Sequence, residues 1–249
     1  MICNLPEDPL YIRAEHVLTC TQQTKKSWFH QIRSICLLYD LPHPLVLLHD
    51  PPPKEIFKNM VKSHIMNHWE IQLRAALLPL SSLQYFKPEF FSLAKPHPIL
   101  WTAGSNPYEV YKVIVQCRML SGRYRTEILA RHWSYNKSGH CLAFTCTDIK
   151  EDLAHILLSC PAYTQSRVRL RKLWLSCNHP HIRQLLSTIL IGPETDLIQF
   201  ILDPSVHPQV ILFSQNHSSS DTLRVVFHLT RTWCFTMHRE RAKLLGRWP

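Results

Sequence analysis

Three cysteines and one histidine lie close together in the sequence, in an arrangement typical of a metal site. They are Cys141, Cys146, His155 and Cys160, with intervals of four, eight and four residues between them. Three thiolates and one imidazole complete a tetrahedral Zn²⁺ site, and thiolates suit this borderline-soft ion. Because four protein ligands leave no coordination position for a water molecule, such a site is structural and not catalytic. The spacing therefore predicts a small zinc knuckle that needs its metal to hold its fold.

A helix must carry the histidine of this site. Asp148 followed by Glu151 resembles a helix cap, which predicts a helix over residues 149–159. His155 lies away from the apolar stripe of that helix, so a place in the hydrophobic core is not expected for it. The stripe consists of Leu153, Ile156 and Leu157.

The last ligand can join the site only if this helix ends before it. Residues five apart on a continuous α-helix point about 140° apart, so His155 and Cys160 could not then share a metal. Pro161 removes this obstacle, because a proline pushes the residue before it out of the helical conformation. Two alternatives stay open. In one, Cys160 belongs to the apolar stripe and the two loop cysteines are incidental thiols; in the other, His140 is a ligand in place of Cys141.

No second constellation in the sequence could do chemistry. The five glycines are too far apart for a dinucleotide-binding loop, a Walker loop or a nucleophile elbow. Adjacent carboxylates occur only near the amino terminus, at Glu7 and Asp8, and in the first turn of the expected helix, at Glu151 and Asp152. We therefore expect no enzymatic activity.

Basic residues are concentrated in the middle of the chain. Residues 1–106 carry ten Lys or Arg and eight Asp or Glu, residues 107–175 carry eleven and five, and residues 176–249 carry seven and five. The net charges are therefore +2, +6 and +2, which sum to the +10 of the whole chain. We divide the chain accordingly into a helical segment, a basic zinc-knuckle module and a carboxyl-terminal helical segment. The basic module could bind nucleic acid, although a solvated basic face has the same composition.

Hydrophobic periodicity predicts an all-α fold. Residues 24–38 form one expected helix, with Trp28, Ile32 and Ile35 on one side, and a long helix follows the three prolines at 51–53 and ends at Leu77. A helix that starts at Pro107 has an apolar stripe and ends before Gly122. Its expected cap is Asn106, and its stripe consists of Val110, Val113, Ile114 and Cys117.

The carboxyl-terminal segment contains a further amphipathic helix, from Leu223 to Leu244. Its apolar face is expected to pack in the core, and a neighbouring strip of basic residues forms one edge. The apolar face consists of Val226, Phe227, Thr230, Cys234, Met237 and Leu244, and the basic edge consists of Arg224, His228, Arg231, His238 and Arg239.

Export and membrane insertion are not expected. The amino terminus has acids and prolines where a signal peptide needs cations and an apolar run, and charged residues and prolines interrupt every long apolar stretch. Five of the nine cysteines stand singly in apolar segments, which is typical of buried thiols in a reducing compartment. We therefore expect an intracellular protein, in the nucleus or the cytoplasm.

Several motifs resemble one family. The runs that begin at Cys117 (Cys-Arg-Met-Leu-Ser-Gly-Arg-Tyr-Arg-Thr-Glu) and at Arg131 (Arg-His-Trp-Ser) precede the cysteine–histidine group. Together they resemble the carboxyl-terminal region of the reverse-transcriptase polyprotein of non-LTR (LINE-type) retrotransposons, over residues 8–248 and most strongly over 107–162. The resemblance implies a Cys-Cys-His-Cys zinc knuckle that engages RNA or DNA. Neither the polymerase aspartate pair nor an endonuclease segment is present, so a carboxyl-terminal piece without either activity is expected.

Two hypotheses follow. In the first, the chain is a zinc-stabilised module that binds RNA or DNA through phosphate contacts, with Tyr124 or Trp133 stacking on bases. In the second, the same knuckle only docks helices, and the partner is a protein. The oligomeric state is not specified by the sequence. The expected phosphate contacts are Arg118, Arg123, Arg125, Arg131, Lys137, Arg167, Arg169, Arg171 and Lys172.

Overall fold

The molecule is built from helices joined by short loops. The computed structural model describes residues 28–246 except 81, 82, 91, 94, 135–137, 217 and 218, together with Ile12 and His16. Within these residues no β-strand forms, and one antiparallel bridge pairs His140 with Lys150. The expected all-α class is therefore confirmed. The chain forms two compact units, Met1–Ala75 (the N-terminal unit) and Ala76–Pro249 (the C-terminal unit).

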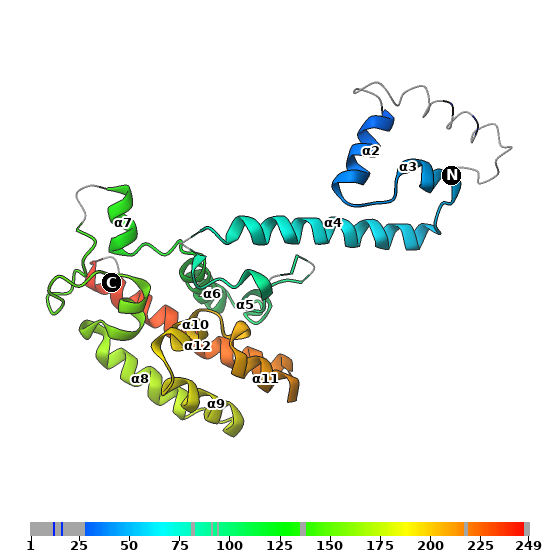
Figure 1. Cartoon of the computed structure of the whole chain (residues 1–249). Coiled ribbons are helices and arrows are strands. Elements are labelled where there is room, and N and C mark those ends of the chain that lie inside the picture. Colours follow the sequence, from blue (N-terminus) through cyan, green and yellow to red (C-terminus); the bar gives the residue numbers. More distant parts are fainter. Residues whose placement is uncertain are drawn as a thin grey trace. The chain divides into compact units, whose positions relative to one another are not determined.

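The N-terminal unit has a small core. Among the described residues its helices are α2 (Trp28–Leu38), α3 (Pro44–His49) and most of α4 (Lys54–Leu77), shown from blue to cyan in Figure 1. Phe29 of α2 and Leu48 of α3 are buried against each other. On the apolar side of α2 that the sequence indicates, Trp28 and Ile35 are exposed. The first residues of that expected helix, 24–27, lie outside the described residues.

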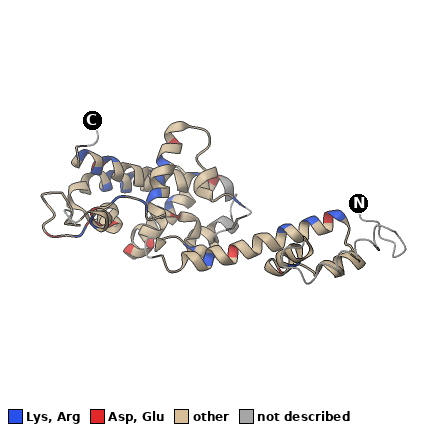
Figure 2. Ribbon diagram, turned by 90° about the horizontal axis from the view of Figure 1, so that it is seen from above, with Lys and Arg blue, Asp and Glu red and all other residues tan. Residues whose placement is uncertain are grey.

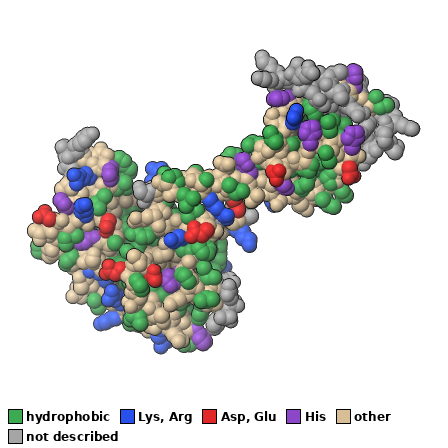
Figure 3. Space-filling model, viewed as in Figure 1, with side chains coloured by type: hydrophobic (Ala, Val, Ile, Leu, Met, Phe, Trp, Pro, Cys, Tyr) green, Lys and Arg blue, Asp and Glu red, His purple; other side chains and the backbone are tan. Residues whose placement is uncertain are grey.

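Helix α4 confirms the expected long helix. It starts directly after Pro53, where a proline suits a helix start, and it ends at Leu77. None of its residues is buried, and its large apolar side chains include the exposed Ile56, Trp69 and Ile71. Hydrophobic side chains are accordingly visible on the surface of this unit in Figure 3, coloured green.

The C-terminal unit is organised around its last helix. This helix, α12, packs against α6, α8, α10, α11 and η3, and Figure 1 shows it in orange to red. The elements in chain order are η2 (Pro88–Phe90), α5 (Pro98–Trp101), α6 (Pro107–Leu120), α7 (Glu127–Trp133), η3 (His155–Ser159), η4 (Pro161–Tyr163), α8 (Thr164–Leu175), α9 (Pro180–Leu190), α10 (Glu194–Leu202), η5 (Pro204–Val206), α11 (Pro208–Asn216) and α12 (Ser219–Leu244).

One hydrophobic core holds this unit together. The rings of Trp174 and Trp233 are fully buried with centroids 4.7 Å apart, and Phe200 packs edge-on against Trp174 at 5.6 Å. Aromatic side chains of this size dominate the free energy gained on burial. The sequence predicted a boundary between the basic module (107–175) and the carboxyl-terminal segment (176–249). In the structure, residues of both segments share this core and belong to the same unit.

Helix α6 begins as expected but buries a different face. The side chain of Asn106 accepts a hydrogen bond from the Tyr108 N–H at 2.9 Å, which confirms the cap. In the expected stripe, however, Val110 and Ile114 are exposed. The buried face instead includes Gln116, whose amide nitrogen donates to Ile201 O, Leu202 O and Thr230 Oγ1. The face of α6 that packs on α10 and α12 is therefore the face that carries Gln116, and not the expected stripe.

The expected apolar face of α12 is confirmed except at Leu244, which is 38% exposed, and the expected basic edge is partly wrong. Val226, Phe227 and Cys234 are fully buried. Arg231 is 1% exposed, since its Nε donates to Phe227 O at 2.9 Å and its Nη2 to Thr102 Oγ1 at 2.7 Å. This arginine therefore serves internal packing and presents no charge to a ligand.

None of the described helices combines the length and the hydropathy that crossing a bilayer requires.

Candidate metal centre

A loop in the C-terminal unit presents two of the cysteines. We call residues 139–151 the knuckle loop. The backbone N–H groups of Cys141 and Glu151 donate across it, over 2.8 and 3.0 Å. Gly139 and Asp148 have left-handed backbone angles, with φ of 79° and 55°, and so turn the chain on the two sides of the loop. The loop thereby folds back on itself and directs its thiols into the unit.

The helix that carries the histidine starts later than expected. A cap at Asp148 was wrong, because this residue lies in the left-handed region and not in a cap conformation. The cap is Asp152, whose carboxylate accepts a hydrogen bond from the His155 N–H at 2.7 Å. Only the turn from Leu153 to Ser159 is helical.

A π-helical turn brings the two distal ligands together. Within η3 the Cys160 N–H donates to His155 O at 2.7 Å, a bond that spans five residues. Such a turn is wider than an α-helical one and is frequent at functional sites. Cys160, with φ −55° and ψ 119°, then leaves the helical conformation before Pro161. The expected end of the helix at this cysteine is therefore confirmed. The wide turn brings Cys160 close to His155.

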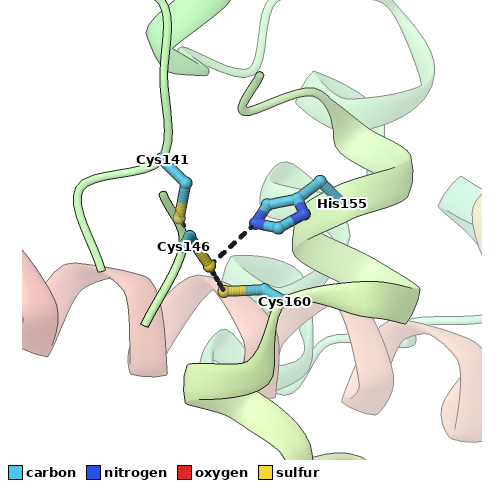
Figure 4. A group of neighbouring side chains, drawn as sticks. All are labelled: Cys141, Cys146, His155 and Cys160. Carbon is cyan, nitrogen blue, oxygen red and sulfur yellow. Dashed lines mark hydrogen bonds between the residues drawn. The ribbon is translucent and has the colours of Figure 1, made fainter. Parts of the chain in front are cut away.

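All four predicted ligands meet at one buried point, drawn in Figure 4. The Cys160 Sγ lies 3.8 Å from the Cys141 Sγ and 3.7 Å from the Cys146 Sγ, and the latter lies 3.5 Å from His155 Nε2. Their four ligand atoms are all within 4.8 Å of one another. The cluster could therefore hold a metal ion, and His140, the alternative ligand, is not part of it.

The surroundings of the sulfurs disfavour a charged thiolate unless a cation is bound. Burial raises the pKa of the Cys141 thiol to about 12 and also raises the pKa of the Cys160 thiol. Backbone N–H groups of Ala143 and Ala162 oppose this effect, because each donates to one of the two sulfurs. A divalent cation would supply the positive charge that thiolates need here.

The imidazole is held for coordination through one nitrogen. Burial lowers the pKa of His155, which favours the neutral ring that a metal ligand must be. Its Nδ1 faces the Ser159 hydroxyl at 3.4 Å, whereas its Nε2 faces Cys146. A partner at the outer nitrogen fixes the ring orientation of a metal-binding histidine.

A buried arginine lies beside the cluster. Arg167 was expected to contact phosphate, and that expectation was wrong, since it is 7% exposed. Its Nη2 donates to Thr164 Oγ1 at 3.1 Å, and its Nη1 is buried with no hydrogen-bond partner among the described residues. Burial lowers the pKa of this guanidinium, and the nearby Cys160 sulfur is the strongest influence that raises it.

A buried ion pair fastens the knuckle loop to α12. The Glu151 Oε1 accepts hydrogen bonds from Arg241 Nη2 at 2.6 Å and Nε at 3.0 Å, and from the Glu127 N–H at 2.9 Å. The carboxylate side chain is 1% exposed and the guanidinium 7%. No sequence pattern predicted this contact, which joins residues 90 positions apart.

Most of the expected phosphate contacts lie on the surface. Lys137 lies outside the described residues. The other members form no ion pair with a carboxylate of the described residues. Figure 2 shows the Lys and Arg positions along the helices in blue. The exposed members are Arg118, Arg123, Arg125, Arg131, Arg169, Arg171 and Lys172.

The two expected stacking residues differ in accessibility. Trp133 is 65% exposed at the end of α7. Tyr124 is 8% exposed, its hydroxyl lies 3.2 Å from His238 Nδ1, and the Arg241 guanidinium lies over its ring at 5.7 Å. Stacking of a base on Tyr124 was therefore a wrong expectation, because protein atoms already cover the ring.

Comparisons with protein-family models, with curated proteins and with solved structures found no match to this chain.

Proposed function

We propose that the C-terminal unit is a zinc-stabilised helical module that binds nucleic acid. The spacing of the ligand atoms carries the zinc-binding part of the proposal. In a tetrahedral site, Zn–S bonds of about 2.3 Å place two sulfurs about 3.8 Å apart, and a Zn–N bond of about 2.0 Å gives a sulfur–nitrogen separation of about 3.5 Å. The corresponding separations here are 3.7 and 3.8 Å between sulfurs and 3.5 Å from Cys146 to His155.

Arg167 fits the charge that such a centre would carry. Three thiolates, a neutral imidazole and Zn²⁺ have a net charge of about −1, which a buried cation offsets. No carboxylate among the described residues forms an ion pair with Arg167. The anionic centre would therefore be its counter-charge.

Replacing Arg167 by methionine is expected to weaken zinc binding about tenfold, because outer-shell partners contribute at this scale to metal affinity. The stability of the metal-free protein should not fall, since an uncompensated buried charge is removed. Competition with a chromophoric chelator measures the affinity. The matched control is Arg171→Met, an exposed arginine one turn further along α8. Equal zinc affinity in Arg167→Met and the parent would contradict the assignment.

The exposed cations support the nucleic-acid part of the proposal. Two of the buried basic side chains are paired with carboxylates: Lys112 with Glu109 at 2.7 Å, and Arg241 with Glu151 at 2.6 Å. The exposed arginines near the knuckle have no such partner among the described residues. Unpaired surface cations are free to displace counterions from phosphates.

Binding of a labelled duplex or single strand should weaken steeply as salt rises, because association with phosphates releases counterions. Replacing Arg123 and Arg125 together by glutamine should lower the salt slope by about one to two units, since each phosphate contact contributes about 0.7 to 0.9. Fluorescence anisotropy over a salt series checks this. A salt-independent affinity, or no binding at low salt, would contradict the proposed function.

This function agrees with the resemblance to the carboxyl-terminal region of non-LTR retrotransposon reverse transcriptases, which remains part of the proposal. In that setting the module would hold RNA or DNA and would have no polymerase or endonuclease activity of its own.

A second candidate is a zinc-stabilised scaffold for a protein partner. Exposed apolar side chains on the knuckle loop favour it: Phe144 is 96% exposed, and Leu142 and Ile149 are 48% and 44% exposed. Exposed apolar groups of this kind often mark protein contacts. Zinc binding without any nucleic-acid binding would favour this candidate over the first.

A further inference from the structure

A groove runs between α7 and the knuckle loop. It has a volume of 690 Å³, within the range of about 300–1,000 Å³ typical of ligand sites. Arg131, His132 and Trp133 line it from α7, and Gly139 and Lys150 line it from the loop. Among the described residues that line it there is no carboxylate, so the groove is basic. Around the α7 end of this unit, Figure 3 shows basic and histidine side chains in blue and purple.

The arginine in the groove is positioned by the loop. A methyl group at Gly139 would approach the Arg131 Cδ to 3.2 Å, so the arginine stem lies directly against this glycine. In the same loop, the bridge between His140 and Lys150 fixes the backbone that carries the lysine. Because metal ligation would order the knuckle loop, the same metal would hold these two cations in the lining of the groove.

The tryptophan gives the groove a second kind of recognition. Trp133 is 65% exposed although an indole of this size gains free energy when it is covered. A planar aromatic group beside two cations matches the chemistry of a nucleotide, in which a flat base adjoins charged phosphates. In a duplex both faces of each base are already stacked, so only an unpaired base offers a free face to the indole.

We propose that this groove binds one unpaired nucleotide of a single strand, with the base stacked on Trp133 and the flanking phosphates on Arg131 and Lys150. This proposal rests on the proposed nucleic-acid function and deepens it. It places single-strand recognition at α7, whereas the exposed arginines of α8 would contact phosphates of either form of nucleic acid.

The test compares two fluorescein-labelled probes by anisotropy at one salt concentration: an oligothymidylate of about 20 nucleotides and a duplex of the same length. In Trp133→Ala we expect a loss of about tenfold in affinity for the single strand and less than twofold for the duplex. Trp133→Phe should recover much of the single-strand affinity, because a phenyl ring can still stack. Arg131→Gln and Lys150→Gln should each weaken single-strand binding further than Arg171→Gln does.

Trp69→Ala is the matched control, since Trp69 is exposed on α4 and outside the groove. Zinc content and circular dichroism of Trp133→Ala should equal those of the parent, because the side chain lies on the surface. Unchanged single-strand binding in Trp133→Ala, or an equal loss for both probes, would overturn the groove assignment while the nucleic-acid function stands. A parent chain that binds neither probe at low salt would overturn the proposed function itself, and the groove with it.

Discussion

Cys146→Ser is expected to lose the bound metal and to lower the melting temperature of the C-terminal unit by roughly 8–16 °C, which corresponds to about 4 kcal/mol for a unit of this size. Cys146 is the ligand that faces both the histidine, at 3.5 Å, and the last cysteine, at 3.7 Å. A serine oxygen is a harder and weaker ligand for Zn²⁺ than a thiolate. Metal analysis together with thermal melts followed by circular dichroism measures both effects.

The control for this prediction is Cys177→Ser, because Cys177 is a half-buried free thiol outside the cluster. It should keep the metal and melt within a few degrees of the parent. The metal-dependent account is contradicted if Cys146→Ser holds as much metal as the parent and melts at the same temperature. Removal of the metal from the parent by a chelator should reproduce the Cys146→Ser melt, since both changes remove the same bonds.

Arg241→Met is expected to lower the free energy of unfolding by about 3–5 kcal/mol, because it leaves the Glu151 carboxylate buried without its cation. This side chain is 1% exposed, and Arg241 provides two of its hydrogen bonds, at 2.6 and 3.0 Å. The double variant Glu151→Gln/Arg241→Met should be more stable than Arg241→Met alone, because the uncompensated charge is then absent. Urea unfolding of the whole chain measures these differences.

Arg239→Met is the matched surface control, since its side chain is 42% exposed and its contact with Glu240 is 3.9 Å long. A surface pair of this kind contributes at most about 1 kcal/mol. A loss below about 1 kcal/mol in Arg241→Met, equal to that of the control, would show that the ion pair does not hold the knuckle loop against α12.

The metal centre could be predicted from the sequence because its ligands are close along the chain. All four lie within twenty residues, so the spacing of cysteines and the effect of Pro161 on its neighbour could be judged from local rules. The π-helical turn was not predicted, since a proline indicates only that a helix ends and not how wide its last turn is. Asp152 was missed as the cap because Asp148 offered a similar pattern earlier in the chain.

Burial of basic residues was harder to predict than the metal ligands. For Arg167, however, the sequence contains a signal of burial that was overlooked. Arg167 lies on the same helical face as Tyr163, Leu170 and Trp174, all of them buried, so its position within the period indicated an inward side chain. Its place in a run of arginines suggested a surface role instead. The burial of Arg241 could not be read from the sequence, because its partner Glu151 comes from a distant part of the chain.

Helices were predicted better than the faces they bury. Local signals such as the prolines before α4 and the Asn106 cap of α6 mark where a helix starts. Which face turns inward depends on the neighbouring helices: Gln116 is buried because carbonyl groups at the end of α10 accept its hydrogen bonds. Tertiary contacts of this kind cannot be predicted from the hydrophobic periodicity of a single helix.

The most direct test of the account is the metal content of the purified whole chain, measured by elemental analysis beside the Cys146→Ser variant. We expect one zinc ion per parent chain and none in the variant. Co²⁺ exchanged into the parent should give the absorption spectrum of a tetrahedral thiolate site. A parent chain that is folded, contains no metal and takes up neither zinc nor cobalt would show that Cys141, Cys146, His155 and Cys160 do not form a zinc site.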